Sequence, residues 1–279
     1  MKSGTLYIVA TPIGNLEDIT FRAVRILGEV DLIAAEDTRH SRKLLAHFGI
    51  SRPLTSYFDH NKHFKGSYII EKLKGGLSVA LVTDAGTPCV SDPGYQLVRD
   101  AAAGGILVVP VPGPSAAVAA LSAAGLPTDR FAFEGFLPSR SGKRREKLRL
   151  LKDEERVLVF HESPRRLVAT LPDLLEIMGD REAVVARELT KIHEEFVRGK
   201  LSEIIERLKG CPVKGEVVFL VAPEPAAAVP VHERSEELLR EYIAGGRLSL
   251  KDAVARTAKE TGKARSDVYA EALRIKKES

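Results

Sequence analysis

Cysteine is scarce in this chain of 279 residues, which contains only Cys89 and Cys211. The two form neither a Cys-x-x-Cys pair nor a disulfide framework, so a small disulfide-stapled fold is excluded and a reducing compartment is favoured. Long hydrophobic runs are also missing, since none approaches the roughly 20 residues that span a bilayer. A single lysine precedes the strand-like segment Thr5–Ala10, without the apolar stretch of a signal peptide. We therefore expect a cytoplasmic protein that makes no use of a membrane.

The glycine-rich loops that hold nucleotide phosphates are absent too. No G-x-G-x-x-G follows a predicted strand and no G-x-x-x-x-G-K-[ST] occurs, which argues against a dinucleotide fold, the commonest methyltransferase loop and a P-loop nucleotidase. His60 and His63 have no third ligand at a recognisable spacing, so we expect a polar loop there and no metal. His161-Glu162-Ser163 lacks the elbow of a serine nucleophile and is expected to precede a helix that begins at Pro164.

Charge is present in both signs, with 42 basic and 38 acidic residues and a net charge of +4. This balance indicates an acidic partner such as nucleic acid only weakly. The distribution is more informative, because Arg140–Lys152 carries seven basic residues and one acidic residue. Such a segment is typical either of a phosphate-binding surface or of a solvated helix face. The candidate phosphate ligands are Arg140, Lys143, Arg144, Arg145 and Lys147.

Short apolar runs alternate with helical patterns, which predicts an α/β fold with a parallel sheet in the first half. The strands expected there are Leu6–Ala10, Leu32–Ala35, Leu54–Tyr57, Ser78–Thr83 and Ile106–Val111. The helices expected there are Thr20–Leu27, Ser41–Phe48, Ser67–Lys74, Gly94–Ala103 and Ser115–Ala124. A second series has strands at Phe131–Gly135, Val157–His161, Ala183–Glu188, Glu194–Arg198 and Glu216–Val221, and helices at Lys143–Lys152, Arg165–Met178 and Leu201–Lys209.

The chain ends in a separate helical pattern. Ala222–Pro230 is typical of a stiff Pro/Ala linker. Ser249 is expected to cap one helix that ends near Gly262, and Ser266 to cap the next, as in a helix-turn-helix-like module. Such a module serves nucleic-acid contact or packing equally well. We thus expect α/β domains over residues 1–125 and 126–225, with a ligand cleft between them, and a helical module over residues 232–279.

The loop after the strand at Ser78–Thr83 is unusually long for a strand-to-helix turn. Ordinary turns of this kind take about two to six residues, whereas this one continues to Gly94 with small, polar and turn-forming side chains. Ligands bind at the carboxyl ends of parallel strands, so the loop is a candidate ligand site. Three other polar segments end strands in the same way: Thr11–Asn15, Ala35–Arg39 and Ala186–Lys191.

Seven segments together resemble the ribosomal RNA small-subunit methyltransferase I family, within the tetrapyrrole (corrin/porphyrin) methylase fold. They are Thr11–Thr20, Glu36–Arg39, Asp84–Gly94, Pro112–Ala116, Phe133–Pro138, Glu162–Arg166 and Ala186–Glu195. The resemblance implies S-adenosyl-L-methionine as methyl donor, bound between two α/β domains without a glycine-rich loop. It implies the ribose 2′-hydroxyl of a cytidine, position 1402 of the decoding centre in 16S rRNA, as acceptor. The 30S subunit is the implied partner, and a homodimer is the implied assembly.

The resemblance also assigns residues. Those implied to hold the cofactor are Pro12, Asp84, Ala85, Gly86, Thr87, Ser115, Ala116, Phe160, Arg187, Leu189 and Val217. An alcohol is a poor nucleophile until its proton is removed or shared, so a base and a cation are expected beside it. The candidates at the strand ends are Glu36, Asp37, Arg39, Glu188 and Lys191.

Two other functions remain open at this point. A small-molecule methylase of the same fold, acting on a tetrapyrrole, would have no use for a basic segment and a basic helical tail. A non-catalytic RNA-binding assembly factor with a dead cofactor pocket is disfavoured by the intact Asp84–Gly94 loop.

Overall fold

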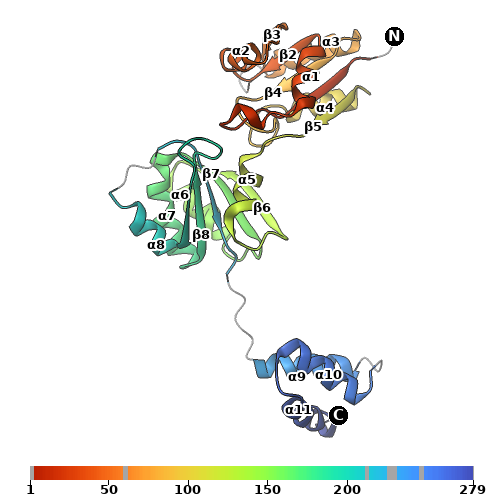
Figure 1. The fold of residues 1–279 in the computed structure, drawn as a ribbon, viewed down its shortest axis with the longest axis vertical. Helices are drawn as coiled ribbons and strands as arrows, with labels where there is room; N and C mark the ends of the chain where they lie inside the picture. Colours follow the sequence, from red (N-terminus) through yellow and green to blue (C-terminus); the bar gives the residue numbers. More distant parts are fainter. Residues whose placement is uncertain (1–2, 59–61, 211–213, 225–230, 245–247, 279) are drawn as a thin grey trace. The chain divides into compact units, whose positions relative to one another are not determined.

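The computed structural model describes residues 3–58, 62–210, 214–224, 231–244 and 248–278. Cys211, the residues around His60 and most of the expected Pro/Ala linker lie outside these ranges. The chain forms two compact units, Met1–Glu224 and Pro225–Ser279. The first unit contains two five-stranded sheets (Figure 1).

The first sheet is entirely parallel. It consists of β1 (Thr5–Val9), β2 (Leu32–Ala35), β3 (Leu54–Ser56), β4 (Val79–Val82) and β5 (Leu107–Val111), in the order β3-β2-β4-β1-β5. Every strand lies within one residue of its predicted bounds. Because β4 lies between β2 and β1, the loops that follow these three strands leave the same edge side by side.

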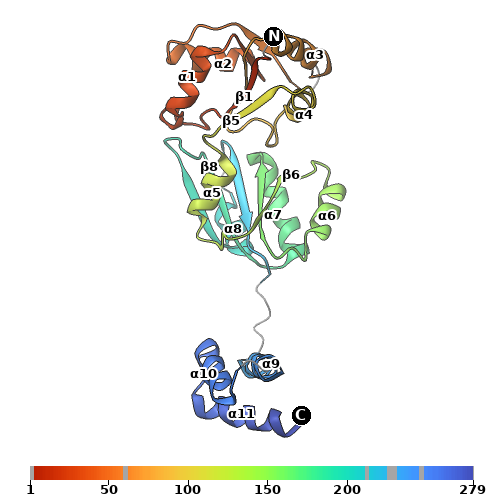
Figure 2. The same ribbon diagram turned by 90° about the vertical axis from the view of Figure 1, so that its right-hand side faces the viewer.

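Both faces of the first sheet are covered, which explains why its strands are nearly continuous apolar runs. Ile33 and Ala80 pack under α1 (Phe21–Glu29) and α2 (Thr38–His47), whereas their neighbours Leu32 and Val79 pack under α3 (Lys62–Lys74) and α4 (Tyr95–Ala103). Figure 2 shows the two helix pairs on opposite sides of the strands. A short 3-10 turn, η1 (Leu16–Asp18), precedes α1.

α2 begins at Thr38, three residues before the predicted start at Ser41. The reason is a local hydrogen bond, because the Asp37 side chain accepts from the backbone amide of Arg39 and caps the helix. The helix therefore directly follows the loop of β2. As a result, the side chains of its first turns lie at the ligand-binding edge of the sheet.

The second sheet is mixed. It consists of β6 (Phe131–Phe136), β7 (Val157–Glu162), β8 (Glu182–Arg187), β9 (Glu195–Lys200) and β10 (Val217–Val221), in the order β6-β7-β10-β8-β9. Only β6 and β7 run parallel, and the other neighbours are antiparallel. The predicted strands are again confirmed to within two residues.

Residues alternate between two hydrophobic clusters along this sheet. Phe160 and Phe219 face α6 (Ser141–Leu150), α7 (Pro164–Met178) and α8 (Leu201–Leu208), whereas Val159 and Leu220 face α5 (Ala116–Ala124). α5 therefore packs on the second sheet, although its residues fall within the 1–125 range expected for the first domain. α7 begins at Pro164, as predicted.

The second unit is a three-helix assembly of α9 (Val231–Ala244), α10 (Leu250–Thr261) and α11 (Arg265–Glu278). Ser249 caps α10 and Gly262 ends it in a left-handed conformation, both as predicted. Ser266 is the second residue of α11, so the prediction that it caps this helix is wrong by two residues. Within the described residues, no helix is long and apolar enough to cross a membrane.

Candidate active site

Thr11 fastens the loop after β1 to the loop after β4. Its backbone amide donates to the carbonyl of Gly86 at 2.9 Å, and the amide of Gly86 donates back at 3.0 Å. The buried Thr11 hydroxyl also donates to the carbonyl of Thr83 at 3.1 Å. The loops after β1 and β4 are therefore hydrogen-bonded to each other at the carboxyl edge of the sheet, and we call this pair of loops the ledge.

Acidic side chains join the loop after β2 to this ledge. The hydroxyl of Thr83 donates to Oε2 of Glu36 at 2.6 Å, and the backbone amide of Asp37 donates to Oδ1 of Asp84 at 3.1 Å. Glu36 and Asp84 thus hold the three loops together. This network explains why short polar side chains follow β2 and β4.

Gly14 lies against the segment that follows β8. A Cβ atom at this position would be 2.8 Å from the carbonyl oxygen of Leu189 and 2.6 Å from Cγ of Lys191. Both distances are shorter than real Cβ contacts allow, so the close approach requires glycine. All four polar segments predicted from the sequence therefore meet at one place.

The loop after β4 keeps an unusual backbone conformation. Cys89 and Ser91 have positive φ angles of 71° and 64°, and Gly94 has φ of 147°. A Cβ atom on Gly94 would be 2.4 Å from the sulfur of Cys89, so only glycine fits. Thr87 joins the loop to the segment after β5 by donating to the carbonyl of Pro114 at 3.1 Å. Strain of this kind persists where surrounding contacts enforce it, often at ligand sites.

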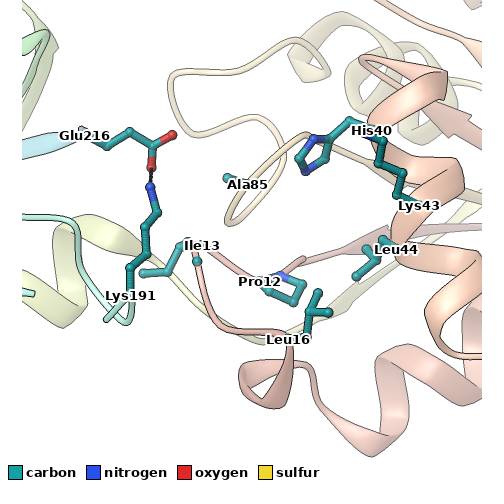
Figure 3. Close-up of a pocket in the computed structure, with 10 residues that line it drawn as sticks. Pro12, Ile13, Leu16, His40, Lys43, Leu44, Ala85, Lys191 and Glu216 are labelled. Atoms are coloured by element: carbon teal, nitrogen blue, oxygen red, sulfur yellow. Dashed lines mark hydrogen bonds and ion pairs between the residues drawn. The ribbon is translucent and has the colours of Figure 1, made fainter. Parts of the chain in front are cut away.

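Two cavities open at this junction. We call the first, of about 360 Å³, the α2 pocket (Figure 3). It is lined by Pro12, Ile13, Gly14, Leu16, His40, Lys43, Leu44, Ala85, Lys191 and Glu216. In Figure 3, Lys191 and Glu216 stand on one side, His40 and Lys43 on the other, and Pro12 lies between them.

We call the second cavity, of about 240 Å³, the loop pocket. It is lined by Ile13, Ala85, Gly86, Thr87, Val90, Ser91, Asp92, Ser115, Ala116, Ala117, Phe133, Phe136, His161 and Glu216. Ile13, Ala85 and Glu216 line both cavities. The two pockets are therefore neighbours that share a wall.

Lys191 is the cation that lines the α2 pocket opposite α2. Its Nζ donates to Glu188 at 2.9 Å and to Glu216 at 3.3 Å. Burial opposes the charged form, but the two carboxylates outweigh it and raise the pKa of Lys191. The hydrogen bond from Lys191 lowers the pKa of Glu188, and a backbone bond from Glu216 adds to this effect. Lys191 is therefore a permanent positive charge.

The acidic groups of the first sheet differ in their electrostatics. The hydrogen bonds from Arg39 hold the pKa of Asp37 far below its usual value. Burial raises the pKa of Asp84, and burial with the nearby charges of Glu36 and Asp84 raises the pKa of Asp92 to about 6. Asp37 is thus a fixed anion, whereas Asp92 exchanges its proton near neutral pH.

His161 is a partly buried side chain that lines the loop pocket. The rings of Phe133 and Phe136 contact it edge-on, at centroid distances of 5.1 Å and 5.5 Å. Its Nε2 is buried and has no hydrogen-bond partner among the described residues. Burial also lowers the pKa of His161. A neutral imidazole with an unused nitrogen is a ready partner for a ligand group.

Six of the eleven residues predicted to hold the cofactor line one or both pockets. Gly86, Thr87, Ser115 and Ala116 line the loop pocket, Pro12 lines the α2 pocket, and Ala85 lines both. Asp84 lines neither pocket, but its carboxylate accepts the hydrogen bond from Asp37 that joins the loops after β2 and β4.

The second-domain members of that set are farther from the cavities. Leu189 and Val217 are buried beside the site, and Arg187 is paired with Glu195. The Phe160 side chain lines neither pocket, because it stacks on Phe219 on the sheet face turned toward α6 and α7, and its assignment to the cofactor stays a prediction. One residue along the same strand, His161 lines the loop pocket in its place.

Of the predicted catalytic residues, only Lys191 lines a pocket. Glu188 holds Lys191 in place, and Glu36 and Asp37 brace the loops. Arg39 is paired with Asp37 and its side chain is 85% exposed.

The basic segment is mostly neutralised by acids. Arg144 is buried and pairs with Asp173 at 2.7 Å, so its assignment to RNA is corrected. Arg145 is shared between Asp173 and Glu176, and Lys147 pairs with Glu134. Arg140 and Lys143 form no ion pair with any residue that the structure describes.

Sequence reasoning missed His40, Lys43 and Leu44, which lie on the pocket side of α2. Their spacing of three and four residues marks one helix face, but the predicted helix began too late to include His40. It also missed Phe133, Phe136, His161, Asp92 and Glu216. The Phe133–Pro138 and Asp84–Gly94 segments contain three of these five, so the signal lay in the motifs themselves.

Comparison with protein families gives a match to "Tetrapyrrole (Corrin/Porphyrin) Methylases" over residues 5–205. The chain is 48% identical to "Ribosomal RNA small subunit methyltransferase I" of Halalkalibacterium halodurans, over 95% of this chain and 93% of the relative. It is also 48% identical to the protein of that name from Pseudomonas aeruginosa, over 98% of both chains.

Solved structures with the same fold are more distant in sequence. A diphthine synthase superposes with a TM-score of 0.62 at 18% identity, covering 78% of this chain and 90% of that one. A uroporphyrin-III C-methyltransferase from Thermus thermophilus, complexed with S-adenosylhomocysteine, gives 0.57 at 22% identity, covering 78% and 97%. These likenesses establish the fold.

Proposed function

The chain belongs to the ribosomal RNA small subunit methyltransferase I family, within the tetrapyrrole methylases. On this basis we propose that it catalyses a methyl transfer to ribosomal RNA. The methyl donor is S-adenosylmethionine. The acceptor is the ribose 2′-hydroxyl of a cytidine in 16S rRNA, at position 1402 of the decoding centre. The active protein is a homodimer that acts in the cytoplasm on the 30S subunit.

The observation that supports this proposal is that the two pockets are neighbours and share lining residues. Methyl transfer from a sulfonium is a direct displacement, so the acceptor oxygen must approach the methyl group in line and at close range. Two neighbouring cavities separated by Ile13 and Ala85 suit a donor in one and an acceptor in the other. No metal is required for a reaction of this type.

The loop pocket fits the donor. The residues around it combine Gly86 and Thr87 of the loop after β4 with the aromatic rings of Phe133 and Phe136. The unused Nε2 of His161 suits a polar group of the ligand. S-Adenosylmethionine supplies an activated methyl group, and these residues orient it and exclude water.

The α2 pocket fits an acceptor nucleotide. Pro12, Leu16 and Leu44 form an apolar surface for a base, and Lys191 supplies a positive charge for a developing alkoxide or an adjacent phosphate. Glu188 positions Lys191 through their hydrogen bond. Glu36, Asp37 and Glu188 remain our candidates for the group that accepts the hydroxyl proton.

Methyl transfer from labelled S-adenosylmethionine tests the function directly. We expect label in 30S subunits or in naked 16S rRNA, mapped to the 2′-oxygen of one cytidine. Label in a tetrapyrrole and none in RNA would favour the small-molecule alternative. Binding of the cofactor with no transfer to either would favour the non-catalytic assembly factor.

The same methyl-transfer assay tests which carboxylate accepts the proton of the acceptor hydroxyl. Glu36→Gln, Asp37→Asn and Glu188→Gln are compared in single-turnover experiments at saturating cofactor. The variant that lacks the base should lose most of its rate while its affinity for S-adenosylmethionine persists. If all three retained rates near wild type, none of these carboxylates would be the base.

A further inference from the structure

The basic residues of α2 differ from those of α6. Arg42 and Lys43 are exposed and form no hydrogen bond or ion pair with any residue that the structure describes. On α6, by contrast, Arg144, Arg145 and Lys147 are paired with acids. Unpaired exposed cations are available for phosphate, whereas paired ones must first give up their partners.

The position of α2 is equally informative. His40, Lys43 and Leu44 line the α2 pocket on the side opposite Lys191, as Figure 3 shows. A ribose inside an RNA strand has a phosphate on each side. Lys191 is engaged by Glu188 and Glu216, so among these pocket residues Lys43 is the lysine without a described partner that can meet such a phosphate.

We propose that the exposed basic residues of α2 bind the phosphates of the RNA strand beside the acceptor nucleotide. They are His40 and Lys43, which line the α2 pocket, and Arg42, which lies on the adjoining side of the helix; we call the three the α2 basic face. The nucleotide itself leaves its stack and enters the α2 pocket, where Pro12, Leu16 and Leu44 contact the base. This inference rests on the proposed function and names the surface that recognises its substrate. The occupant is a single RNA strand.

The acids near this face do not neutralise it. Asp37 is engaged by Arg39, and Glu36 accepts a hydrogen bond from Thr83. Asp84 accepts from the backbone amide of Asp37, and its charge acts on His40, but it forms no ion pair with Arg42 or Lys43. Arg42 and Lys43 therefore have no acidic partner among the described residues.

The test is the salt dependence of binding to 30S subunits. In the cofactor-loaded protein, the double variant Arg42→Glu and Lys43→Glu should bind at least about 10-fold more weakly at low salt. The slope of log affinity against log salt should fall by about one for each lost phosphate contact. Lys43→Gln alone should give a smaller change in the same direction.

Two controls accompany this variant. Lys209→Glu reverses an exposed lysine at the end of α8, which is 73% exposed and paired with Glu206, and should leave affinity and slope unchanged. Lys143→Glu reverses an unpaired lysine of α6 and separates the two basic surfaces. S-Adenosylmethionine affinity should match wild type in every variant, which shows that the fold is intact.

The outcomes separate this inference from the proposed function. If the α2 double variant binds 30S subunits like Lys209→Glu, the α2 basic face is not the RNA surface, whatever the enzyme methylates. If Lys143→Glu alone flattens the salt slope, α6 is the surface instead. If wild type binds RNA through α2 but transfers no methyl group, the proposed function fails and the inference holds.

Discussion

Single residues set the charge of the α2 pocket. Lys191 stays protonated although it is partly buried, because Glu188 and Glu216 both face its Nζ. A cation held in this way needs no reorganisation when negative charge develops on the acceptor oxygen.

Lys191→Ala should therefore lower the single-turnover rate of RNA methylation by about 10²-fold, the usual cost of removing one group that stabilises an oxyanion. The affinity for S-adenosylmethionine, measured by calorimetry, should not change. If Glu188 acts only by positioning Lys191, Glu188→Gln should have a smaller effect, since Glu216 still faces Lys191. A rate near wild type for Lys191→Ala would remove this residue from the chemistry.

Asp92 gives the protein a pH dependence of its own. Burial raises its pKa from 3.8 to about 6 in the folded state. Between pH 3.8 and about pH 6, Asp92 holds a proton in the folded protein that it has already lost in the unfolded chain. The Asp92 contribution to the free energy of unfolding therefore falls as the pH rises through this window. Asp92→Asn cannot ionise and should be more stable than wild type at pH 7.5.

Urea unfolding at pH 4 and pH 7.5 checks this prediction. The stability advantage of Asp92→Asn should be small at the lower pH and clearly larger at the higher pH. An advantage that is equal at both values would mean that Asp92 titrates normally in the folded protein.

At the scale of secondary-structure elements, the contact between α6 and α7 depends on a buried ion pair. The side chains of Arg144 and Asp173 are 7% and 13% exposed, and Asp173 also binds Arg145. Removing one partner of such a pair leaves an uncompensated buried charge. The basic character of α6 is thus used largely within the fold.

Asp173→Ala should accordingly lower the free energy of unfolding by about 3–5 kcal/mol. Glu176→Ala removes an acid that is 66% exposed and should cost about 0–1 kcal/mol. Denaturant titration measures both. Equal and small effects would show that Arg144 finds another partner when Asp173 is absent.

α6 also shows what a linear sequence hides at this scale. The seven basic residues of Arg140–Lys152 are visible in the sequence, but Asp173 lies 29 residues after Arg144 and on another helix. Sequence spacing relates neighbours within a helix and not between helices. The same limit applies to α2, whose cations were passed over although they lie beside the motif Glu36–Arg39.

At the scale of the whole molecule, the two units have separate roles. All residues that line the α2 pocket and the loop pocket lie between Pro12 and Glu216, within the unit Met1–Glu224. Each unit also has its own hydrophobic cluster. The described lining of both pockets is therefore built by the first unit.

A chain that ends at Glu224 should fold and bind S-adenosylmethionine with wild-type affinity. Calorimetry on the truncated and full-length proteins tests this, with circular dichroism as the control for folding. A loss of cofactor affinity in a folded truncated protein would show that the second unit supports the site.

Sequence alone was sufficient for the strands, most helices and the four polar loops, because period, turn chemistry and helix caps are local properties. The family could be recognised from its motifs because these are also local stretches of sequence. Packing was needed to learn that Phe160 faces away from the site while His161 faces it, and that Arg144 is buried. It was needed as well to join Gly14 to Lys191 and to set α2 against the pocket. These relations depend on contacts between segments distant in the chain, which no local pattern encodes.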